Sequence, residues 1–262
     1  MWWFLIIPVV LVVLTALVFA FLKSPTAVGH VSEMIVRTKL RMHSEKSEKV
    51  LSNLYVPKPE GGTSEIDILF ITRKGLIVIE NKHYAGYIFG TDTDLHWTVT
   101  YKHQTKSGKN QVKKISFYNP VLQNRTHIKC LETYLSQNIK TYSLVTFGNP
   151  SRLMNITVKA HDVFICNHYG IADYLKNVRN DPDALSDEQI QELYKRLLPL
   201  KTKDAEVKQQ HVQEINDKFN QTNTCPLCGS PLVLRTSKRG DHAGSQFYGC
   251  SNYPKCRYTK KL

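Results

Sequence analysis

Four cysteines near the end of the chain have the spacing of a metal site. They are Cys225, Cys228, Cys250 and Cys256, in the pattern C-x2-C-x21-C-x5-C. Two short-spaced cysteine pairs separated by a loop are the usual ligands of one tetrahedral zinc ion. The segment 223–262 is too short to bury a core that folds alone, so bound metal would supply its folding free energy. We therefore predict a structural zinc ribbon here.

A second group of polar residues interrupts two apolar runs. Asp67 lies in the first run, and Glu80 and Lys82 lie two residues apart in the second, so they share one face of a strand. If residues 72–75 form a four-residue hairpin loop, Asp67 lies opposite Glu80, with Cβ atoms about 4.5–5.5 Å apart. Two carboxylates this close repel unless a cation such as Mg²⁺ binds them. The alternative is an exposed hairpin face with a salt bridge from Lys82 to an acid.

The sequence around the four cysteines resembles the zinc finger at the C-terminal end of bacterial type I topoisomerases. The likeness covers about 38 residues and is carried by the strings CPLCGSPLVLR, at 225–235, and GSQFYGCSNYPKCR, at 244–257. In that family the module binds single-stranded DNA, and the resemblance implies the same activity here. It does not imply that the chain is a topoisomerase.

The residue types of the ribbon suit this role. Arg235 and Arg257 supply positive charge, and Tyr253 and Tyr258 offer surfaces on which bases can stack for about 1–3 kcal/mol each. We expect these four residues to contact nucleic acid. The alternative is that the aromatic side chains only pack the small domain, and this is the role we expect for Phe247.

The pattern D-x12-E-x-K formed by Asp67, Glu80 and Lys82 resembles the core of PD-(D/E)XK nucleases. A narrower resemblance, to the nuclease-related domain (NERD), spans roughly residues 28–150. It is carried by EID at 65–67, Gly75, IENK at 79–82, Gly86 and NPVLQ at 119–123. The resemblance implies a restriction-endonuclease-like α/β fold, in which helices flank a mixed sheet.

The resemblance also implies metal-assisted hydrolysis of phosphodiesters. Asp67 and Glu80, helped by the carbonyl group of Asn81, would hold Mg²⁺, which would lower the pKa of a bound water. Lys82 would position that water and stabilise the charge that develops on the phosphate. No organic cofactor is expected.

Two further positions follow from the same resemblance. Glu33 lies where the superfamily often has an additional acid, and it is a candidate outer-shell ligand. Gln123 lies where related nucleases carry a Q-x-x-x-Y motif, and it would hold the phosphate or Lys82. The sequence departs from this motif because His127 replaces the tyrosine. A histidine at this position could still contact phosphate.

The elements that must position these residues can be read from apolar periodicity and turn residues. Helices are expected at 28–42 and 120–137, and strands at 66–71, 76–82, 86–90, 97–101, 142–147 and 162–166. A capping box formed by Ser186 and Gln189 predicts a further helix that ends at Pro199, with Ile190, Leu193, Leu197 and Leu198 on one face.

The first residues of the chain predict a membrane anchor. Residues 2–22 contain no charge and would form a helix about 31 Å long, enough to cross a bilayer. A cleaved signal peptide is the alternative, but the apolar run is long and no positive region precedes it. Lysine and arginine follow the run, so the positive-inside rule places the body in the cytoplasm and the N-terminus outside.

We therefore expect four parts: a transmembrane anchor at 1–23, a NERD-like α/β domain at 28–180, a helical linker at 181–222 and the ribbon at 223–262. A cytoplasmic location disfavours disulfides, so Cys130 and Cys166 are expected to be buried apolar side chains.

The charge balance indicates a polyanionic partner. The formal net charge is +13, from 35 Lys and Arg against 22 Asp and Glu, and residues 95–131 contain seven Lys and Arg but no acid. Nucleic acid or the anionic inner leaflet would suit such a chain, although a solvated basic surface is the alternative for the run at 95–131.

The whole sequence predicts an inner-membrane, Mg²⁺-dependent nuclease with a DNA-binding zinc ribbon. One alternative is a non-catalytic DNA-binding platform on the membrane, and another is an accessory protein in DNA topology. The sequence does not indicate an oligomeric state.

Overall fold

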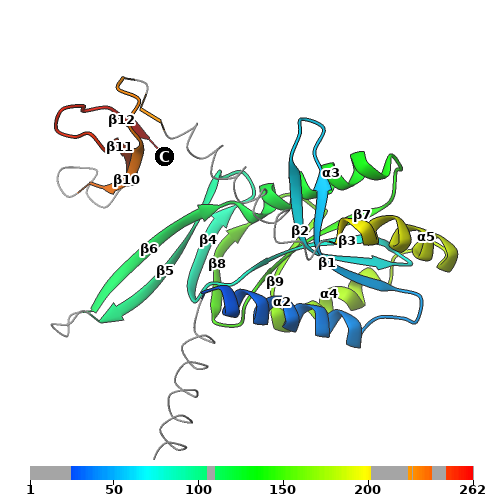
Figure 1. Cartoon of the computed structure of the whole chain (residues 1–262). Helices are drawn as coiled ribbons and strands as arrows, with labels where there is room; N and C mark the ends of the chain where they lie inside the picture. Colours follow the sequence, from blue (N-terminus) through cyan, green and yellow to red (C-terminus); the bar gives the residue numbers. More distant parts are fainter. Residues whose placement is uncertain (1–24, 105–109, 202–223, 226, 238–245, 262) are drawn as a thin grey trace, which may run out of the picture. The chain divides into compact units, whose positions relative to one another are not determined.

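A computed structural model describes residues 25–104, 110–201, 224–225, 227–237 and 246–261 (Figure 1). The chain forms two compact units, at 1–202 and 203–262. The expected anchor at 1–23 lies outside the described residues, as does most of the expected linker beyond 201. Among the residues that the structure describes, no helix is both long enough and apolar enough to cross a bilayer.

The first unit is built on a five-stranded mixed sheet in the order β1-β2-β3-β7-β9. The first three strands are antiparallel to one another, and β7 and β9 continue the sheet in parallel with β3. The expected mixed α/β architecture is confirmed. The strands are β1 (Lys49–Pro57), β2 (Thr63–Thr72), β3 (Gly75–Lys82), β7 (Thr141–Phe147) and β9 (Val163–Asn167).

Helices cover both faces of this sheet (Figure 1). One face packs against α2 (Pro25–Met42) and α4 (Ile171–Val178), and the other against α3 (Pro120–Leu135) and α5 (Asp187–Leu197). A short 3-10 turn, η1 (His168–Gly170), links β9 to α4. The two cores are separate because successive side chains of a strand point to opposite faces.

The hairpin between β2 and β3 has the predicted register. Ile71 pairs with Leu76, as expected, but Thr72 also pairs with Gly75, so the turn has two residues rather than four. The Thr72 hydroxyl donates to the Gly75 carbonyl at 2.9 Å and closes the turn. Gly75 has φ 130°, and a Cβ there would lie 2.1 Å from the Lys140 carbonyl oxygen, so only glycine fits. The shorter turn leaves the pairing, and therefore the position of Asp67, unchanged.

A second, four-stranded sheet in the order β6-β5-β4-β8 belongs to the same unit. Its strands are β4 (Gly86–Thr91), β5 (His96–Gln104), β6 (Asn110–Tyr118) and β8 (Ser151–Thr157). It packs on the main sheet through Trp97, whose ring stacks on Phe147 at 6.1 Å between centroids. The sequence did not predict β1, β6, β8 or α4.

The capping box that begins α5 is present, since Ser186 and Gln189 exchange side-chain and backbone hydrogen bonds. Ile190, Leu193 and Leu197 are buried in the core shared with α3. Leu198 is 43% exposed, which corrects its expected place on this face. The cause is that the chain passes there from α5 into the 3-10 turn η2 (Leu198–Leu200), which changes the direction of the side chain.

The second unit contains a three-stranded antiparallel sheet in the order β10-β11-β12. Its strands are β10 (Leu232–Thr236), β11 (Gln246–Cys250) and β12 (Thr259–Lys261). Its core consists of Leu232 and buried cysteines, with Tyr248 and Tyr258 packed against them. So small a core is typical of a domain that a metal holds together.

Candidate functional site

Strand β3 and helix α3 bring three of the expected catalytic residues together. Glu80 and Lys82 point from β3 toward α3, and the Lys82 Nζ lies 2.7 Å from Oε1 of Glu80. The same ammonium group donates to Oε1 of Gln123, on α3, at 2.9 Å. The Glu80 side chain is 1% exposed and that of Lys82 is 22% exposed. The lysine is therefore held in one position at the edge of a buried carboxylate.

Asp67 lies beside this group. Its Oδ2 accepts the backbone N–H of Asn81 at 2.9 Å, just beyond the last paired residues of β2 and β3. Burial, reinforced by the negative charge of Glu80, raises the pKa of Asp67 well above its usual range. The hydrogen bond from Asn81 and the charge of Lys82 lower the Asp67 pKa, but they do not offset burial and the charge of Glu80.

Glu80 has the opposite balance. Burial alone would raise its pKa, but the ammonium group of Lys82 and a hydrogen bond from His127 hold the pKa below its usual value. Burial would similarly lower the pKa of Lys82, but the carboxylates of Glu80 and Asp67 raise it. Lys82 and Glu80 are therefore both charged at neutral pH.

His127 has a role that the sequence analysis did not find. Its Nε2 lies 3.1 Å from Oε2 of Glu80, and its Nδ1 lies 2.7 Å from the Ser64 hydroxyl. The residue is 7% exposed, and the structure places it against Glu80 and Ser64. The sequence contained one indication of this contact. His127 lies four residues after Gln123, so the two share a face of the helix, and Gln123 was already a candidate site residue.

The opposite face of β3 is fixed by a buried polar network around Asn81. Its Oδ1 accepts from the Thr146 hydroxyl at 3.0 Å and lies 2.9 Å from Nε2 of His168, while its Nδ2 donates to the Ser32 hydroxyl at 3.0 Å. The network joins α2, β3, β7 and η1. It fixes the position of Asn81, and the backbone carbonyl group of Asn81 was expected to help to hold a metal.

This network has a measurable pH dependence. Burial, together with the nearby charges of His83 and Lys39, lowers the pKa of His168 to about 4. The pKa of histidine in the unfolded chain is about 6.5, so the folded state favours neutral His168. This contribution to the free energy of unfolding is fully present above pH 6.5 and is lost as the pH falls toward 4. We expect His168→Gln to lose about 2 kcal/mol less stability than the wild type between pH 7 and pH 5. Denaturant unfolding at both pH values measures this, with exposed His161→Gln as the control, and equal losses in all three proteins would contradict it.

Glu33 lies on α2, is half-buried, and makes a side-chain hydrogen bond with Asn53 on β1. Burial, reinforced by the charge of Glu65, raises its pKa against the opposing effect of His30. Its charge also contributes to the raised pKa of Asp67. The structure therefore places Glu33 within electrostatic reach of Asp67, while Lys82 and Gln123 lie on the α3 side of the sheet.

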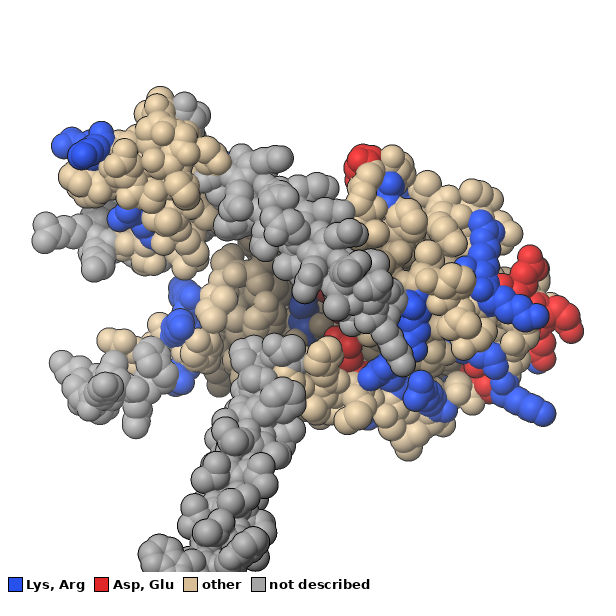
Figure 2. All heavy atoms as spheres, viewed as in Figure 1, with Lys and Arg blue, Asp and Glu red and all other residues tan. Residues whose placement is uncertain are grey.

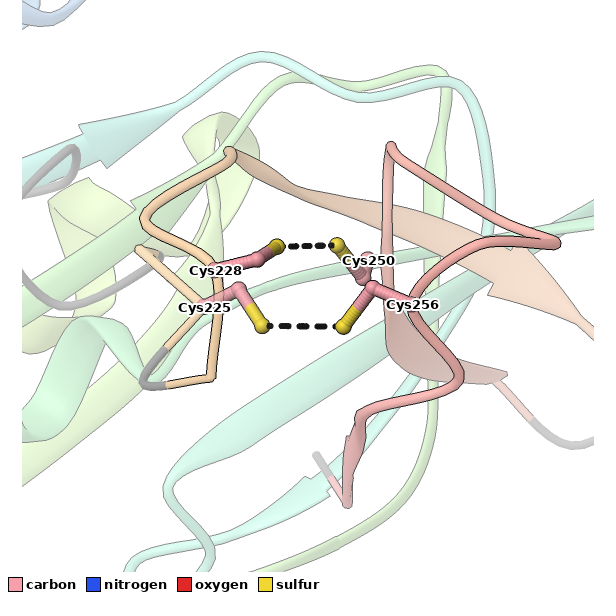
Figure 3. Close-up of side chains that lie close together, drawn as sticks. All are labelled: Cys225, Cys228, Cys250 and Cys256. Atoms are coloured by element: carbon pink, nitrogen blue, oxygen red, sulfur yellow. Dashed lines mark hydrogen bonds between the residues drawn. The ribbon is translucent and has the colours of Figure 1, made fainter.

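The four cysteines of the second unit converge on one point (Figure 3). Their Sγ atoms all lie within 4.8 Å of one another, with 3.6 Å between Cys225 and Cys256 and 3.4 Å between Cys228 and Cys250. Four sulfurs around a tetrahedral zinc lie about 3.8 Å apart, from a Zn–S bond of about 2.3 Å. The donor set and its spacing therefore fit one zinc ion, as predicted.

The expected nucleic-acid residues of the ribbon line a groove of about 650 Å³. Arg235 donates to the Cys250 carbonyl at 3.2 Å, and its guanidinium group lies 5.7 Å from the centroid of the Tyr253 ring. Tyr253 is 62% exposed, whereas Tyr258 packs against the cysteine core. Arg257 and Phe247 also line the groove. The exposed stacking surface is thus Tyr253, with the guanidinium group of Arg235 beside it.

Two family models match the chain. Residues 28–148 match the nuclease-related domain, and residues 222–262 match the topoisomerase DNA-binding C4 zinc finger. Both predicted resemblances are thereby confirmed. The chain carries a nuclease-related domain followed by a topoisomerase-type C4 zinc ribbon.

Individual relatives divide in the same way. An uncharacterized protein of Bacillus anthracis is 29% identical over 192 residues, covering 73% of this chain and 85% of that protein. DNA topoisomerase 1 of Mycoplasma genitalium is 28% identical over 102 residues, covering 37% of this chain but 14% of the enzyme. DNA topoisomerase 1 of Archaeoglobus fulgidus is 55% identical over 38 residues, covering 14% of this chain and 5% of the enzyme. The chain thus spans only a small part of the topoisomerases that it matches. No solved structure matches the chain.

Proposed function

We propose that the first unit is a Mg²⁺-dependent nuclease of the PD-(D/E)XK type, with a restriction-endonuclease-like fold. The observation that carries the proposal is the grouping of Asp67, Glu80, Lys82 and Gln123 where β3 meets α3. A nuclease of this type requires two carboxylates and a lysine at one point on a hairpin. The match to the nuclease-related domain supports the same assignment.

The donor set suits a hard divalent cation. Asp67 and Glu80 supply carboxylate oxygens at one end of the β2–β3 hairpin, and such oxygens are the ligands that Mg²⁺ prefers. Asp67, Glu80 and the Asn81 carbonyl group would hold Mg²⁺, with Glu33 as a candidate outer ligand. When bound, Mg²⁺ would supply charge stabilisation at the phosphate and a more acidic water.

The remaining steps depend on side chains of the chain itself. Lys82 donates hydrogen bonds, so it can orient the attacking water and stabilise the additional negative charge on the phosphate. Gln123 holds the ammonium group of Lys82 at 2.9 Å, and His127 holds the second oxygen of Glu80. These two α3 residues therefore position the reacting groups before substrate binds.

One observation favours a second candidate function. Lys82 and His127 each bond one oxygen of Glu80, which is a complete set of partners for a structural ion pair. A non-catalytic platform that only binds DNA, or an accessory protein in DNA topology, would be compatible with that arrangement. Nuclease assays on the wild type and on Lys82 variants separate these functions.

We propose that the ribbon binds single-stranded DNA in the groove beside Tyr253. Stacking of a base on an exposed ring contributes about 1–3 kcal/mol, so Tyr253→Ala should weaken binding of an oligothymidine by about 5–150-fold. Tyr169, which is 64% exposed in the first unit, is the matched control, and Tyr169→Ala should bind normally. Fluorescence anisotropy of the full chain measures both variants, and equal affinities would exclude stacking on Tyr253.

We also propose that the chain is a single-pass protein of the bacterial inner membrane, with its body in the cytoplasm. The support is the uncharged run at 2–22, followed by Lys23 and further basic residues. A reporter enzyme that is active only in the cytoplasm should be active when fused after Leu262. A second reporter, active only in the periplasm, should be inactive at the same position. Periplasmic activity would show the reverse orientation.

A further inference from the structure

The two longest strands of the second sheet form an arm that extends away from the main sheet (Figure 1). The arm consists of β5 and β6, paired from His96–Tyr118 to Gln104–Asn110. Its base is anchored in the core by Trp97, Val99 and Phe117, which are buried. The described part of the arm beyond Val99 has no buried side chain. The residues of the outer half whose exposure the structure describes, 100–102 and 111–114, therefore add no buried side chain to the core. A role in binding would explain why they extend away from it.

Positive charge lies on both faces of the outer half. Lys114 pairs with Thr100 and Lys102 pairs with Val112, and these two pairs share one face because they are two residues apart. Lys113 pairs with Tyr101 on the opposite face, where its ammonium group lies 5.9 Å from the centroid of the tyrosine ring. All three lysines are exposed. On the face shown in Figure 2, the described residues of the arm include blue side chains and no red ones.

The base of the arm adjoins the candidate catalytic residues. Strand β3 ends at Lys82, and β4, which pairs with β5, begins only four residues later at Gly86. Within this connection, the Tyr84 ring lies 4.5 Å from that of Phe117 on β6. Burial raises the pKa of Tyr84, and the charges of Lys82 and Glu80 act on it in opposite directions. A polyanion bound along the arm would therefore extend toward the catalytic group.

The shape of the arm selects among nucleic acids. A two-stranded β-ribbon fits the major groove of B-form DNA, which is about 12 Å wide, whereas the major groove of duplex RNA is too narrow. The five residues of β5 beyond Val99 span about 17 Å, close to half a helical turn. Lysines on both faces suit a groove bordered by two phosphate backbones. A single strand would need charge on one face only.

We propose that the β5–β6 arm binds the major groove of double-stranded DNA and holds the duplex beside the catalytic group. The contact is made to phosphates, so it depends on charge rather than on base sequence. That the bound duplex is a substrate for cleavage rests on the proposed nuclease function. The contact itself requires no cleavage.

The test uses the full chain in detergent micelles, without Mg²⁺ and without chelator. The arm variant is Lys102→Ala, Lys113→Ala and Lys114→Ala together. The control replaces three exposed lysines elsewhere in the same unit, Lys46, Lys176 and Lys195, so it has the same net charge. Affinity for a duplex of about three helical turns is measured from 50 to 200 mM salt. Melting temperature and zinc content show that each variant is folded.

The arm variant should bind duplex DNA about 10–100-fold more weakly than the control at low salt. The slope of log K against log salt should be less steep by about 2–3, because each phosphate contact contributes about 0.9. Equal affinities and slopes for the two variants would overturn the proposal. It would also be overturned by an equal loss on single strands, or by a loss confined to anionic phosphatidylglycerol vesicles. A chain that binds in this way but cleaves nothing would support the proposed DNA contact of the arm and contradict only the proposed nuclease function.

Discussion

Lys82→Ala should lower the rate of nucleic-acid cleavage by at least about a hundredfold while Mg²⁺ still binds. The expected loss follows from removing the only donor that the structure places between Glu80 and Gln123 among the described residues. Asp67 and Glu80 remain, so calorimetric titration should detect a Mg²⁺ affinity close to that of the wild type. Stability should fall by about 1–3 kcal/mol, because the buried Glu80 loses one of its two partners.

A conservative variant separates catalysis from stability. Lys82→Arg keeps the positive charge beside Glu80, so its melting temperature should stay near that of the wild type, but its longer planar group cannot place a donor at the same point. Cleavage should therefore remain strongly reduced. Lys140 pairs with Asp181 and lies beside the start of β3, at the opposite end of the strand from Lys82, so Lys140→Ala should cleave normally. Full cleavage activity in either Lys82 variant would contradict a catalytic role and show that the Lys82–Glu80 contact is only a structural ion pair.

Cys250→Ser should release the zinc and unfold the ribbon without unfolding the first unit. Structural zinc sites contribute about 10–16 kcal/mol of apparent binding free energy, far more than the apolar contacts of Leu232, Tyr248 and Tyr258 can supply. The wild type should contain one zinc per chain by elemental analysis, and the variant should contain almost none. Affinity for single-stranded DNA should fall with the metal.

The matched control for this prediction is Cys166→Ser. Cys166 is also buried, but it lies on β9 of the first unit, where its pKa is raised to about 12 by burial, as for a thiol in apolar surroundings. It should lose some stability in that unit and keep its zinc. A folded wild type without zinc, or a Cys250→Ser chain that retains it, would exclude the four-cysteine site.

The predicted elements were those that local sequence determines. The β2–β3 hairpin was predictable because a short turn followed by Gly75 fixes the register, and that register brings Asp67 toward Glu80. The helix α5 was predictable from its capping box. The four zinc ligands were predictable because metal chemistry restricts both residue type and spacing.

The contacts that were missed depend on pairing between distant segments. His127 meets Glu80 only because α3 packs across β3, 47 residues away in the sequence. The network of Asn81 joins residues from four separate elements and leaves no local pattern. Strand β6 was missed because its outer half is lysine-rich and exposed, and its strand conformation depends on pairing with β5. In each case, tertiary structure supplies what local propensity does not.

The most direct test of the central claim is digestion of nucleic acid by the full-length wild type. Purified chain in detergent is incubated with single- and double-stranded DNA and RNA, with and without Mg²⁺, beside the Lys82→Ala variant. The proposed site predicts cleavage of at least one substrate that requires Mg²⁺ and is lost in the variant. No cleavage of any substrate, together with no Mg²⁺ binding by calorimetry, would contradict it and leave a DNA-binding platform as the function.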